Sequence, residues 1–240
     1  MIKEKRAVIL AGGKGTRLRP YTVVLPKPLM PIGEYPILEV IIRQLKHYGF
    51  TYITMAVNHQ AEIIKAFFGD GSKWGMRIDY SLEEKALSTM APLKLIKDLP
   101  NDFLVMNGDI LTDLDFGKFY ENHLKNKNIF TISSYQREVK SEFGVLDVDD
   151  ENTLSGFREK PVSVYDVSMG IYMVSKKAVD YIPEDTFYGF DHLMLDLMKN
   201  NEEPKVQKFN GYWLDIGRPD DYDIAINMFE TNSKQFLDEN

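Results

Sequence analysis

Three glycines and three basic residues are packed into one short stretch near the start of the chain. Residues 11–20 read Ala-Gly-Gly-Lys-Gly-Thr-Arg-Leu-Arg-Pro and follow an apolar run at residues 7–10. Glycines let backbone N–H groups approach an anion closely, and Lys14, Arg17 and Arg19 add charge-assisted donors. The stretch therefore predicts a loop that holds phosphate. The alternative is a plain tight turn after a strand.

This glycine loop matches neither of two common phosphate-binding patterns. The P-loop pattern G-x-x-x-x-G-K-[ST] does not occur in the chain. The dinucleotide pattern G-x-G-x-x-G fails because Leu18 stands where its third glycine is required. Neither pattern explains the loop.

Lys27 lies between two prolines, in Pro26-Lys27-Pro28. Proline fixes φ and stiffens the backbone. A stiff backbone gives no advantage to a solvated lysine, but it helps to position a lysine that must contact one phosphate oxygen. We expect an exposed loop that presents Lys27 to phosphate. The alternative is a proline-rich loop with an exposed lysine of no special role.

Alternating strand-like and helix-like segments must position these residues. Apolar patterns predict strands at residues 7–10, 52–57, 77–82, 103–106 and 129–135, and helices at 36–48, 61–68, 91–97, 116–126 and about 220–229. This rhythm predicts an α/β fold with a Rossmann-like, mostly parallel mixed sheet and helices on both faces. Residues 144–148 and 153–157 predict a hairpin, which would be a small antiparallel addition at one edge in the second half.

In such a sheet, ligands bind outside the carboxyl ends of the strands. Asn107-Gly108-Asp109 follows one predicted strand, and Asp215 follows the apolar residues 212–214. Both aspartates are therefore expected on the ligand side, as is the glycine loop. The alternatives are that Asp109 caps the following segment and that Asp215 makes a turn.

Composition excludes several classes of function. The 240 residues suit one large α/β domain, and a net charge of -7 without a long basic stripe argues against nucleic-acid binding. No apolar run approaches the length of a membrane span. The absence of cysteine excludes disulfides and thiolate metal sites, and it fits a cytoplasmic protein.

The spaced pattern resembles the signature of the sugar-1-phosphate nucleotidyltransferases. Its parts, in chain order, are residues 12–20, Thr22, 26–28, 107–109, 143–145, 159–161, 170–172 and 213–219. The resemblance covers essentially the whole chain and corresponds to the family's catalytic domain. It implies the nucleotide-diphospho-sugar transferase fold as a single domain, 1–240, with a nucleotide-binding half at about 1–135 and a sugar-phosphate-binding half at about 136–240.

The resemblance implies transfer of a nucleotidyl group from an NTP to a sugar 1-phosphate, either a hexose or a heptose phosphate. The sugar phosphate attacks the α-phosphorus in line with departing pyrophosphate. Because this nucleophile is already anionic, catalysis is expected to consist of positioning and charge neutralisation. Mg²⁺ is the expected cofactor, since it suits the carboxylate oxygens of Asp109 and Asp215. No nucleic-acid or membrane partner is expected, and a homo-oligomer is left open.

The resemblance also implies roles for individual residues. Arg17 would hold the β- and γ-phosphates and Lys27 the α-phosphate, and with the metal-binding Asp109 and Asp215 they form the catalytic set. The implied nucleotide-binding residues are Leu10, Ala11, Gly12, Gly13, Gly15, Thr16, Arg17, Lys27, Ser88, Thr89, Asn107 and Gly108. Lys160 would hold the sugar's phosphate and Glu159 the sugar hydroxyls, and the implied sugar-phosphate residues are Gly144, Glu159, Lys160, Ser168 and Gly170.

Two segments depart from the family pattern. The nucleobase segment commonly reads Leu-Gly-Thr-Ala-Gly-Pro-Leu, whereas this chain has Ser88 and Ala91 in place of the two glycines. These side chains are expected to narrow the space beside the base and ribose. The sugar-site strand commonly reads Asn-Ala-Gly, and this chain has Ser168-Met169-Gly170. GTP, dTTP, CTP and UTP all stay open. The resemblance favours a guanylyl- or thymidylyltransferase, with a slight preference for the mannose-1-phosphate guanylyltransferase-like branch.

Two other functions compete with this interpretation. A cytidylyltransferase acting on a non-sugar phosphate such as phosphocholine would need an aromatic cage for the quaternary ammonium group. Candidate cage residues are Tyr165, Tyr172, Phe187, Tyr188, Phe190, Tyr212 and Trp213. A non-catalytic, nucleotide-sensing regulatory subunit would be expected to lose Lys27 or an aspartate, and this chain keeps them.

Overall fold

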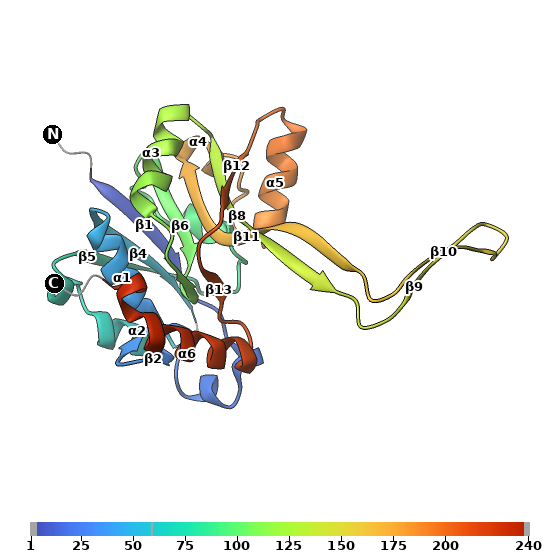
Figure 1. Ribbon diagram of the computed structural model, residues 1–240. Helices are drawn as coiled ribbons and strands as arrows, with labels where there is room; N and C mark the ends of the chain where they lie inside the picture. Colours follow the sequence, from blue (N-terminus) through green and yellow to red (C-terminus); the bar gives the residue numbers. More distant parts are fainter. Residues whose placement is uncertain (1–3, 59, 238–240) are drawn as a thin grey trace.

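The computed structural model describes residues 4–58 and 60–237, within which seven strands form one sheet (Figure 1). The strand order is β12-β8-β11-β6-β1-β4-β5. Six strands run in one direction, and β11 runs antiparallel to its neighbours β6 and β8. The bounds are β1 Lys5–Leu10, β4 Phe50–Val57, β5 Arg77–Leu82, β6 Asp102–Asn107, β8 Phe130–Lys140, β11 Val162–Ser175 and β12 Lys205–Phe209.

Helices cover both faces of the sheet, as the sequence predicts. Strand residues alternate between the faces, so Ala7 and Ile9 pack into one apolar core and Val8 into the other. The first core lies under α1 (Ile37–His47), α2 (Ala61–Phe68), α3 (Phe116–Asn126) and α6 (Pro219–Phe236). The second core lies under α4 (Lys176–Val179), α5 (Phe190–Lys199) and the 3-10 helix Ala91–Leu95. None of the helices in the described residues is long and apolar enough to cross a bilayer.

The first half of the fold agrees with the sequence pattern within a few residues. The helices α2 and α3 and the strand β5 have the predicted bounds. In α1, the apolar residues Leu38, Ile41 and Leu45 are fully buried, and Gly49 beyond the helix has a φ of 80°. A left-handed conformation at that point favours glycine and ends the helix.

The second half contains the expected antiparallel addition, but not at one edge of the sheet. The antiparallel strand of the main sheet is β11, which lies in the interior between β6 and β8. The predicted hairpin does form from β9 (Val145–Val148) and β10 (Leu154–Arg158), and these two strands pair as a separate sheet.

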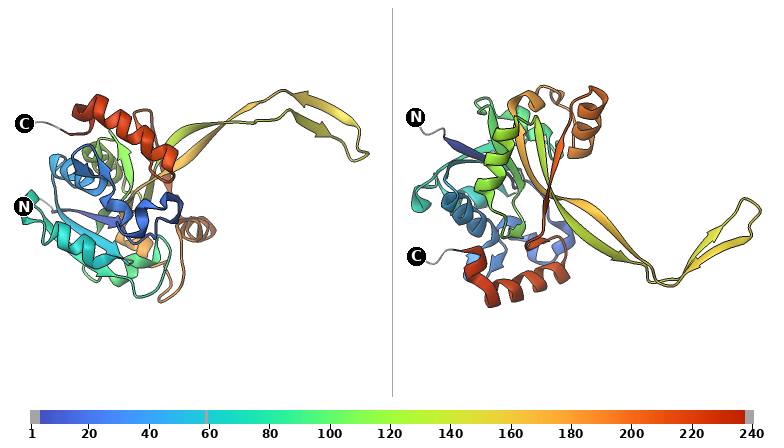
Figure 2. Two further views of the ribbon diagram at one scale, coloured as in Figure 1. Left: turned by 90° about the horizontal axis from the view of Figure 1, so that it is seen from below. Right: turned by 45° about the horizontal axis from the view of Figure 1, so that its top comes forward.

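This hairpin lies at the end of a long projection from the body. Residues 162–168 of β11 pair with residues 140–134 of β8, and this ribbon leaves the sheet before reaching β9 and β10. Figures 1 and 2 show that the ribbon and hairpin extend well away from the helices and the main sheet. We call residues 136–167 the arm.

Two short strand pairs complete the fold. One joins β2 (Pro31–Ile32) to β3 (Tyr35–Pro36), and the other joins β7 (Ile110–Thr112) to β13 (Trp213–Asp215). The second pair connects chain segments about a hundred residues apart in sequence, at the carboxyl end of β6. It therefore determines which side chains meet beside the glycine loop.

Candidate functional site

The glycine loop lines a cavity of about 700 Å³ at the carboxyl ends of the parallel strands. All of the residues that the sequence assigned to nucleotide binding line this cavity, together with Asp109. They come from the ends of β1 and β6, from the Lys27 segment and from the segment at Ser88 and Thr89. The fold thus brings the predicted set together, and its role in binding nucleotide stays a prediction.

Several cavity residues are absent from the sequence-based set. Asn58 directly follows β4 and Glu83 directly follows β5, so the rule that ligands bind at strand ends points to both of them. Phe187, which the sequence marked only as a candidate for an aromatic cage, also lines the cavity and belongs to the irregular segment before α5. The other additions are Lys14, Pro28, Glu84, Lys85, Ala86 and Gly217.

Close packing explains one glycine of the loop. Gly15 has a φ of 59°, and a Cβ atom there would lie 2.9 Å from the Thr22 side chain and 3.2 Å from Lys27 Cβ. The Thr22 hydroxyl donates to the Gly15 carbonyl oxygen at 2.7 Å. A side chain at this position would push the Lys27 segment away from the loop. Gly15 therefore keeps the two basic segments in contact.

Lys27 forms an ion pair with Asp109, its Nζ donating to Asp109 Oδ2. The Lys27 side chain is only 11% exposed and that of Asp109 is 17% exposed. The expectation of an exposed loop is therefore wrong for Lys27, because the stiff segment folds inward against the end of β6. The loop presents its lysine to the interior of the cavity.

The other oxygen of this carboxylate, Asp109 Oδ1, is buried and has no hydrogen-bond partner within residues 4–58 and 60–237. A buried carboxylate oxygen without a partner costs free energy. Such an atom suits a cation or a substrate group that enters the cavity.

Asp215 is brought beside Asp109 by the β7–β13 pair. Asp215 pairs with Ile110 in the ladder, and the Ile216 N–H donates to the Asp109 carbonyl oxygen at 3.1 Å. Burial, followed by the charge of Asp109, raises the pKa of Asp215 above its ordinary value. The charges of Lys27 and Arg17 act in the opposite direction and do not cancel the rise. The folded chain thus holds two carboxylates together at a cost.

These two carboxylates fit a magnesium ion. Mg²⁺ is commonly held by one or two carboxylates, with waters and substrate phosphates completing its shell. The unpaired Asp109 Oδ1 and the mutual repulsion of the carboxylates are what a divalent cation would relieve. Within the described residues no group of three or more His, Cys, Asp or Glu side chains forms a metal cluster. A metal here would therefore depend on the substrate for further ligands.

Arg17 makes no hydrogen bond or ion pair with any other described residue, so its guanidinium can receive an anion. A Cβ on Gly217 would lie 3.4 Å from Arg17 Nη2 and 3.3 Å from Asp215 Oδ2. Gly217 therefore separates the cation from the carboxylate without filling the space between them.

Of the two departures from the family pattern in the segment assigned to the base, one lies at the cavity and the other in the core. Ser88 lines the cavity with a φ of 72°, a conformation that favours glycine. Ala91 is only 2% exposed, belongs to the second core and is not among the cavity residues. The expectation that Ala91 narrows the space beside the base is therefore wrong, because its side chain points into the core.

The predicted sugar-phosphate residues are divided between two places. Gly170 has a φ of 73° and lies so close to Asn107 that a Cβ would be 2.5 Å from its Nδ2 atom. Ser168 Oγ accepts from the Gly170 N–H at 3.2 Å and lies 3.0 Å from the Tyr172 hydroxyl. Gly144, Glu159 and Lys160 lie instead on the arm. None of the five predicted sugar-phosphate residues is among the residues that line the cavity.

The candidate aromatic cage does not form. Tyr172 and Phe190 stack on each other in the body, Tyr165 is on the arm, and Trp213 packs against Tyr135. Among the described members of the set, Phe187 is the one that lines the cavity. The geometry therefore provides no cage for a quaternary ammonium group.

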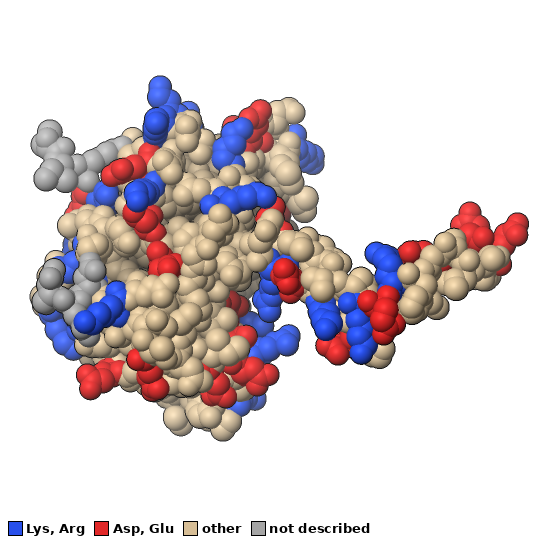
Figure 3. Space-filling view, in the orientation of Figure 1, with Lys and Arg blue, Asp and Glu red and all other residues tan. Residues whose placement is uncertain are grey.

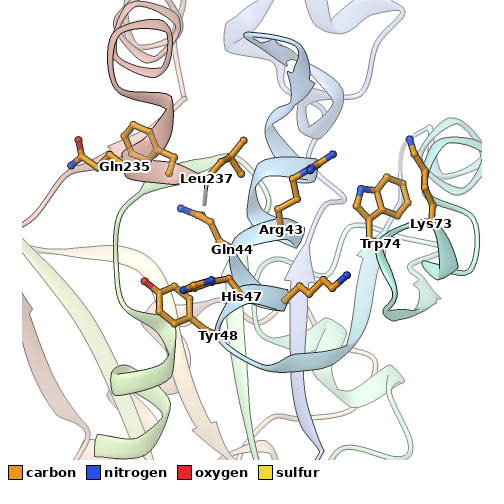
Figure 4. Close-up of a pocket in the computed structure, with 10 residues that line it drawn as sticks. Arg43, Gln44, His47, Tyr48, Lys73, Trp74, Gln235 and Leu237 are labelled. Atoms are coloured by element: carbon orange, nitrogen blue, oxygen red, sulfur yellow. The ribbon is translucent and has the colours of Figure 1, made fainter. Parts of the chain in front are cut away.

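A second cavity, of about 530 Å³, lies between the end of α1, the 3-10 helix Ser72–Trp74 and the end of α6 (Figure 4). Its lining is basic and aromatic, with Arg43, Lys46, His47, Lys73 and Trp74 among its residues. None of its described lining residues is a glycine, a carboxylate or a member of the predicted site. The glycine-loop cavity is therefore the candidate site.

Comparison with known proteins gives consistent results. The family model described as nucleotidyl transferase matches residues 6–233. A UTP--glucose-1-phosphate uridylyltransferase of Synechocystis sp. is 34% identical over 92% of this chain, which spans 62% of that protein's length. A D-glycero-alpha-D-manno-heptose 1-phosphate guanylyltransferase of Campylobacter jejuni is 32% identical, covering 90% of this chain and 96% of its own length.

A solved structure shows the same architecture. HddC from Yersinia pseudotuberculosis has a TM-score of 0.71 and 28% identity, and the match covers 94% of this chain and 99% of that one. This likeness confirms the fold class expected from the sequence.

The cost of holding Asp215 beside Asp109 leads to a stability prediction. Because the folded-state pKa of Asp215 is raised, the fold favours the protonated form and loses stability as pH rises through that pKa. Asp215→Asn removes this loss, so the metal-free variant should melt at a higher temperature than the native chain at neutral pH. The difference should shrink in acid, where the native carboxyl is protonated. Thermal unfolding against pH measures both effects.

The control is Asp150→Asn, which removes an exposed carboxylate at the arm tip. It should leave the melting temperature nearly unchanged. A lower melting temperature for Asp215→Asn at neutral pH would contradict the proposed carboxylate repulsion.

Proposed function

The chain belongs to the nucleotidyl transferase family, and we propose that it transfers a nucleotidyl group from an NTP to a sugar 1-phosphate, releasing pyrophosphate. The observation that carries the proposal is the Lys27–Asp109–Asp215 arrangement beside a glycine-lined cavity. It supplies an inward-facing cation, two carboxylates and close backbone access to phosphate. The names of the Synechocystis and Campylobacter relatives, both acting on sugar 1-phosphates, support the same reaction class.

The reaction needs no proton-abstracting residue. The attacking phosphate oxygen is already anionic, so the protein must bring two anions together and neutralise the charge that develops. Lys27 is held rigidly at the cavity wall and is suited to the α-phosphate, where charge builds up. Arg17, which forms no hydrogen bond or ion pair among the described residues, is suited to the departing β- and γ-phosphates. The backbone N–H groups around Gly12 and Gly13 would hold the remaining oxygens.

Asp109 and Asp215 are the residues that would hold Mg²⁺. A bound Mg²⁺ would supply charge neutralisation to the phosphates. Asp109 has a second task in the chain itself, because its Oδ2 holds Lys27 in place. The ion pair thus orients the lysine before substrate enters, while Oδ1 stays available to a cation.

We favour a guanine nucleotide and a hexose or heptose 1-phosphate. Several relatives are named mannose-1-phosphate or heptose 1-phosphate guanylyltransferases, and HddC was also crystallised with GMP-PN. These relatives bear on the substrate only by analogy, since identities lie near 30%. The cytoplasmic location expected from the cysteine-free sequence and the division into two functional halves stay predictions.

A grid of four NTPs against several sugar 1-phosphates tests the proposal directly, with pyrophosphate release as the readout. GTP with mannose 1-phosphate or a heptose 1-phosphate should give the highest kcat/KM. Release in the presence of Mg²⁺ should stop with excess chelator and return on adding the metal. No release with any pair would reject the function, and full activity in chelator would reject the carboxylate-bound metal.

The role given to Lys27 predicts a large loss in turnover. Lys27→Ala removes the cation from the α-phosphate, and kcat should fall by roughly 10²- to 10³-fold, the usual cost of losing one transition-state donor. Because the change also leaves Asp109 Oδ2 without its partner, folding must be checked by thermal unfolding. Lys199→Ala is the matched control, since Lys199 is an exposed lysine of α5 that does not line the cavity. Near-normal kcat in a folded Lys27→Ala protein would exclude the assignment.

Ser168 predicts an effect on acceptor choice. Asparagine there is longer and adds an amide donor beside Gly170 and Asn107, where the serine now bonds within the strand. Ser168→Asn should raise kcat/KM for ordinary hexose 1-phosphates relative to other acceptors by about tenfold, because a tenfold ratio corresponds to the free energy of about one hydrogen bond. The KM for the NTP should not change. Ser163→Asn, in the arm portion of the same strand, is the control. An unchanged acceptor ratio would show that the serine is neutral.

A further inference from the structure

The cavity alone has little net positive charge for two phosphate-bearing substrates. Its described lining residues include four basic side chains, Lys14, Arg17, Lys27 and Lys85, and three acidic ones, Glu83, Glu84 and Asp109. Lys27 and Lys85 already form ion pairs, with Asp109 and Asp185 respectively. An incoming sugar phosphate therefore needs a further cation, which the body does not place in this cavity.

A candidate cation stands on the arm. Where the ribbon meets the hairpin, Ser141 N–H donates to the Pro161 carbonyl oxygen at 3.0 Å. Gly144 packs so closely there that a Cβ would lie 2.7 Å from the Phe157 ring and 3.2 Å from Glu159 Oε2. Lys160 follows with a φ of 42°. These contacts give the junction a defined local structure that presents Glu159 and Lys160, although its residues belong to neither of the two apolar cores.

The hairpin beyond the junction has one apolar and one polar face. Leu146 lies opposite Phe157, and Val148 lies opposite Leu154. These four side chains are 51–58% exposed and belong to neither core. On the other face, Arg158 pairs with Asp147 at 2.9 Å. A two-stranded hairpin is at best marginally stable by itself in water. We therefore expect the apolar face to pack against another protein surface.

The base of the arm is fixed in direction. The Trp213 indole N–H donates to the Met169 carbonyl oxygen at 3.0 Å, and its ring packs against Tyr135 at 5.5 Å. Lys208 on β12 forms an ion pair with Asp166 at 2.8 Å. These contacts and the β8–β11 ladder, whose register is interrupted between Ser168 and Tyr172, accompany an arm that points away from the body (Figure 2). The arm could reach the cavity of its own chain only if these contacts at its base were broken.

Charge complementarity favours a second copy of the chain as the covering surface. The arm tip carries Asp149, Asp150 and Glu151, which appear as the acidic end of the arm in Figure 3. The cavity rim carries three exposed basic side chains, those of Lys14, Arg17 and Lys85, and one exposed acidic side chain, that of Glu84. Each copy thus has an acidic projection and a cavity rim whose exposed charged side chains are mostly basic, and exchange of two arms would bring the two together under twofold symmetry.

We propose that two copies of the chain exchange arms, so that Glu159 and Lys160 of one copy complete the sugar-phosphate site beside the glycine loop of the other. The role of these residues rests on the proposed function, whereas the exchange itself does not. The apolar face of each hairpin would pack against the other copy.

Complementation between two inactive variants tests the exchange. Lys27→Ala has a defective cavity and an intact arm, and Lys160→Ala has the reverse. With crossed arms, a mixed pair has one intact site, and random pairing restores about a quarter of the native activity. If each arm served its own cavity, the mixture would stay as inactive as the two variants alone. That result, with an active native chain, would overturn the proposal.

A cross-link tests the exchange independently of activity. Because the chain has no cysteine, Glu142→Cys on the arm and Glu84→Cys at the cavity rim introduce the only thiols. A short bis-maleimide should join the doubly substituted chain into a covalent dimer. A cross-link within one chain, or no cross-link, would overturn the proposal. If the native chain showed no activity with any substrate pair, the proposed function would fail while this test still decided the exchange.

The mass in solution tests the covering surface. The native protein in solution should have twice the 27.7 kDa mass of one chain. The double variant Leu146→Ser with Leu154→Ser should have the mass of one chain. Leu195→Ser with Ile224→Ser, which changes equally exposed apolar residues of α5 and α6, should remain a pair. A native chain of single mass, or a paired hairpin variant, would contradict the packing of this face.

Discussion

The close approach of Asp109 and Asp215 is the constraint around which the site is arranged. Two carboxylates in a partly buried position repel each other. Burial first, and the charge of Asp109 second, raise the pKa of Asp215 above its ordinary value despite the opposing charges of Lys27 and Arg17. The chain maintains the arrangement through the β7–β13 pair, whose backbone hydrogen bonds leave neither aspartate free to move apart. This kind of unfavourable contact is typical of functional sites, where stability is exchanged for a prepared binding position.

The other features of the cavity follow from that contact. Lys27 offsets part of the negative charge and is held by it, so one ion pair both stabilises the pocket and aims the lysine. Gly15 keeps a side chain away from Lys27, and Gly217 keeps one out of the space between Arg17 and Asp215. The net positive charge of the cavity lining is small. The position of Lys160 on the arm therefore matters for binding of the acceptor's phosphate.

Much of this could be predicted from the sequence because the signals are local. The α2, α3 and β5 segments have clear apolar periodicity, and the strand-end rule placed Asp109 on the ligand side of the sheet. Asp215 was expected there for the same reason, but it reaches Asp109 through the separate β7–β13 pair. Other features depend on distant contacts. Nothing near Lys27 shows that Asp109 will draw it into the interior, and nothing near Ala91 shows that Tyr188 will hold its backbone in the second core. The arm could not be predicted from the sequence either, since alternating residues in β11 predict a strand without showing where that strand leaves the sheet.

Calorimetric titration of GTP into the protein, with and without Mg²⁺, tests the carboxylate pair most directly. If the two aspartates create a site that only a divalent cation can neutralise, nucleotide binding should be much tighter with Mg²⁺ than without it. Asp109→Asn should largely remove this dependence on the metal. Equal nucleotide affinity with and without Mg²⁺ in the native chain would contradict the central role of the Asp109–Asp215 contact.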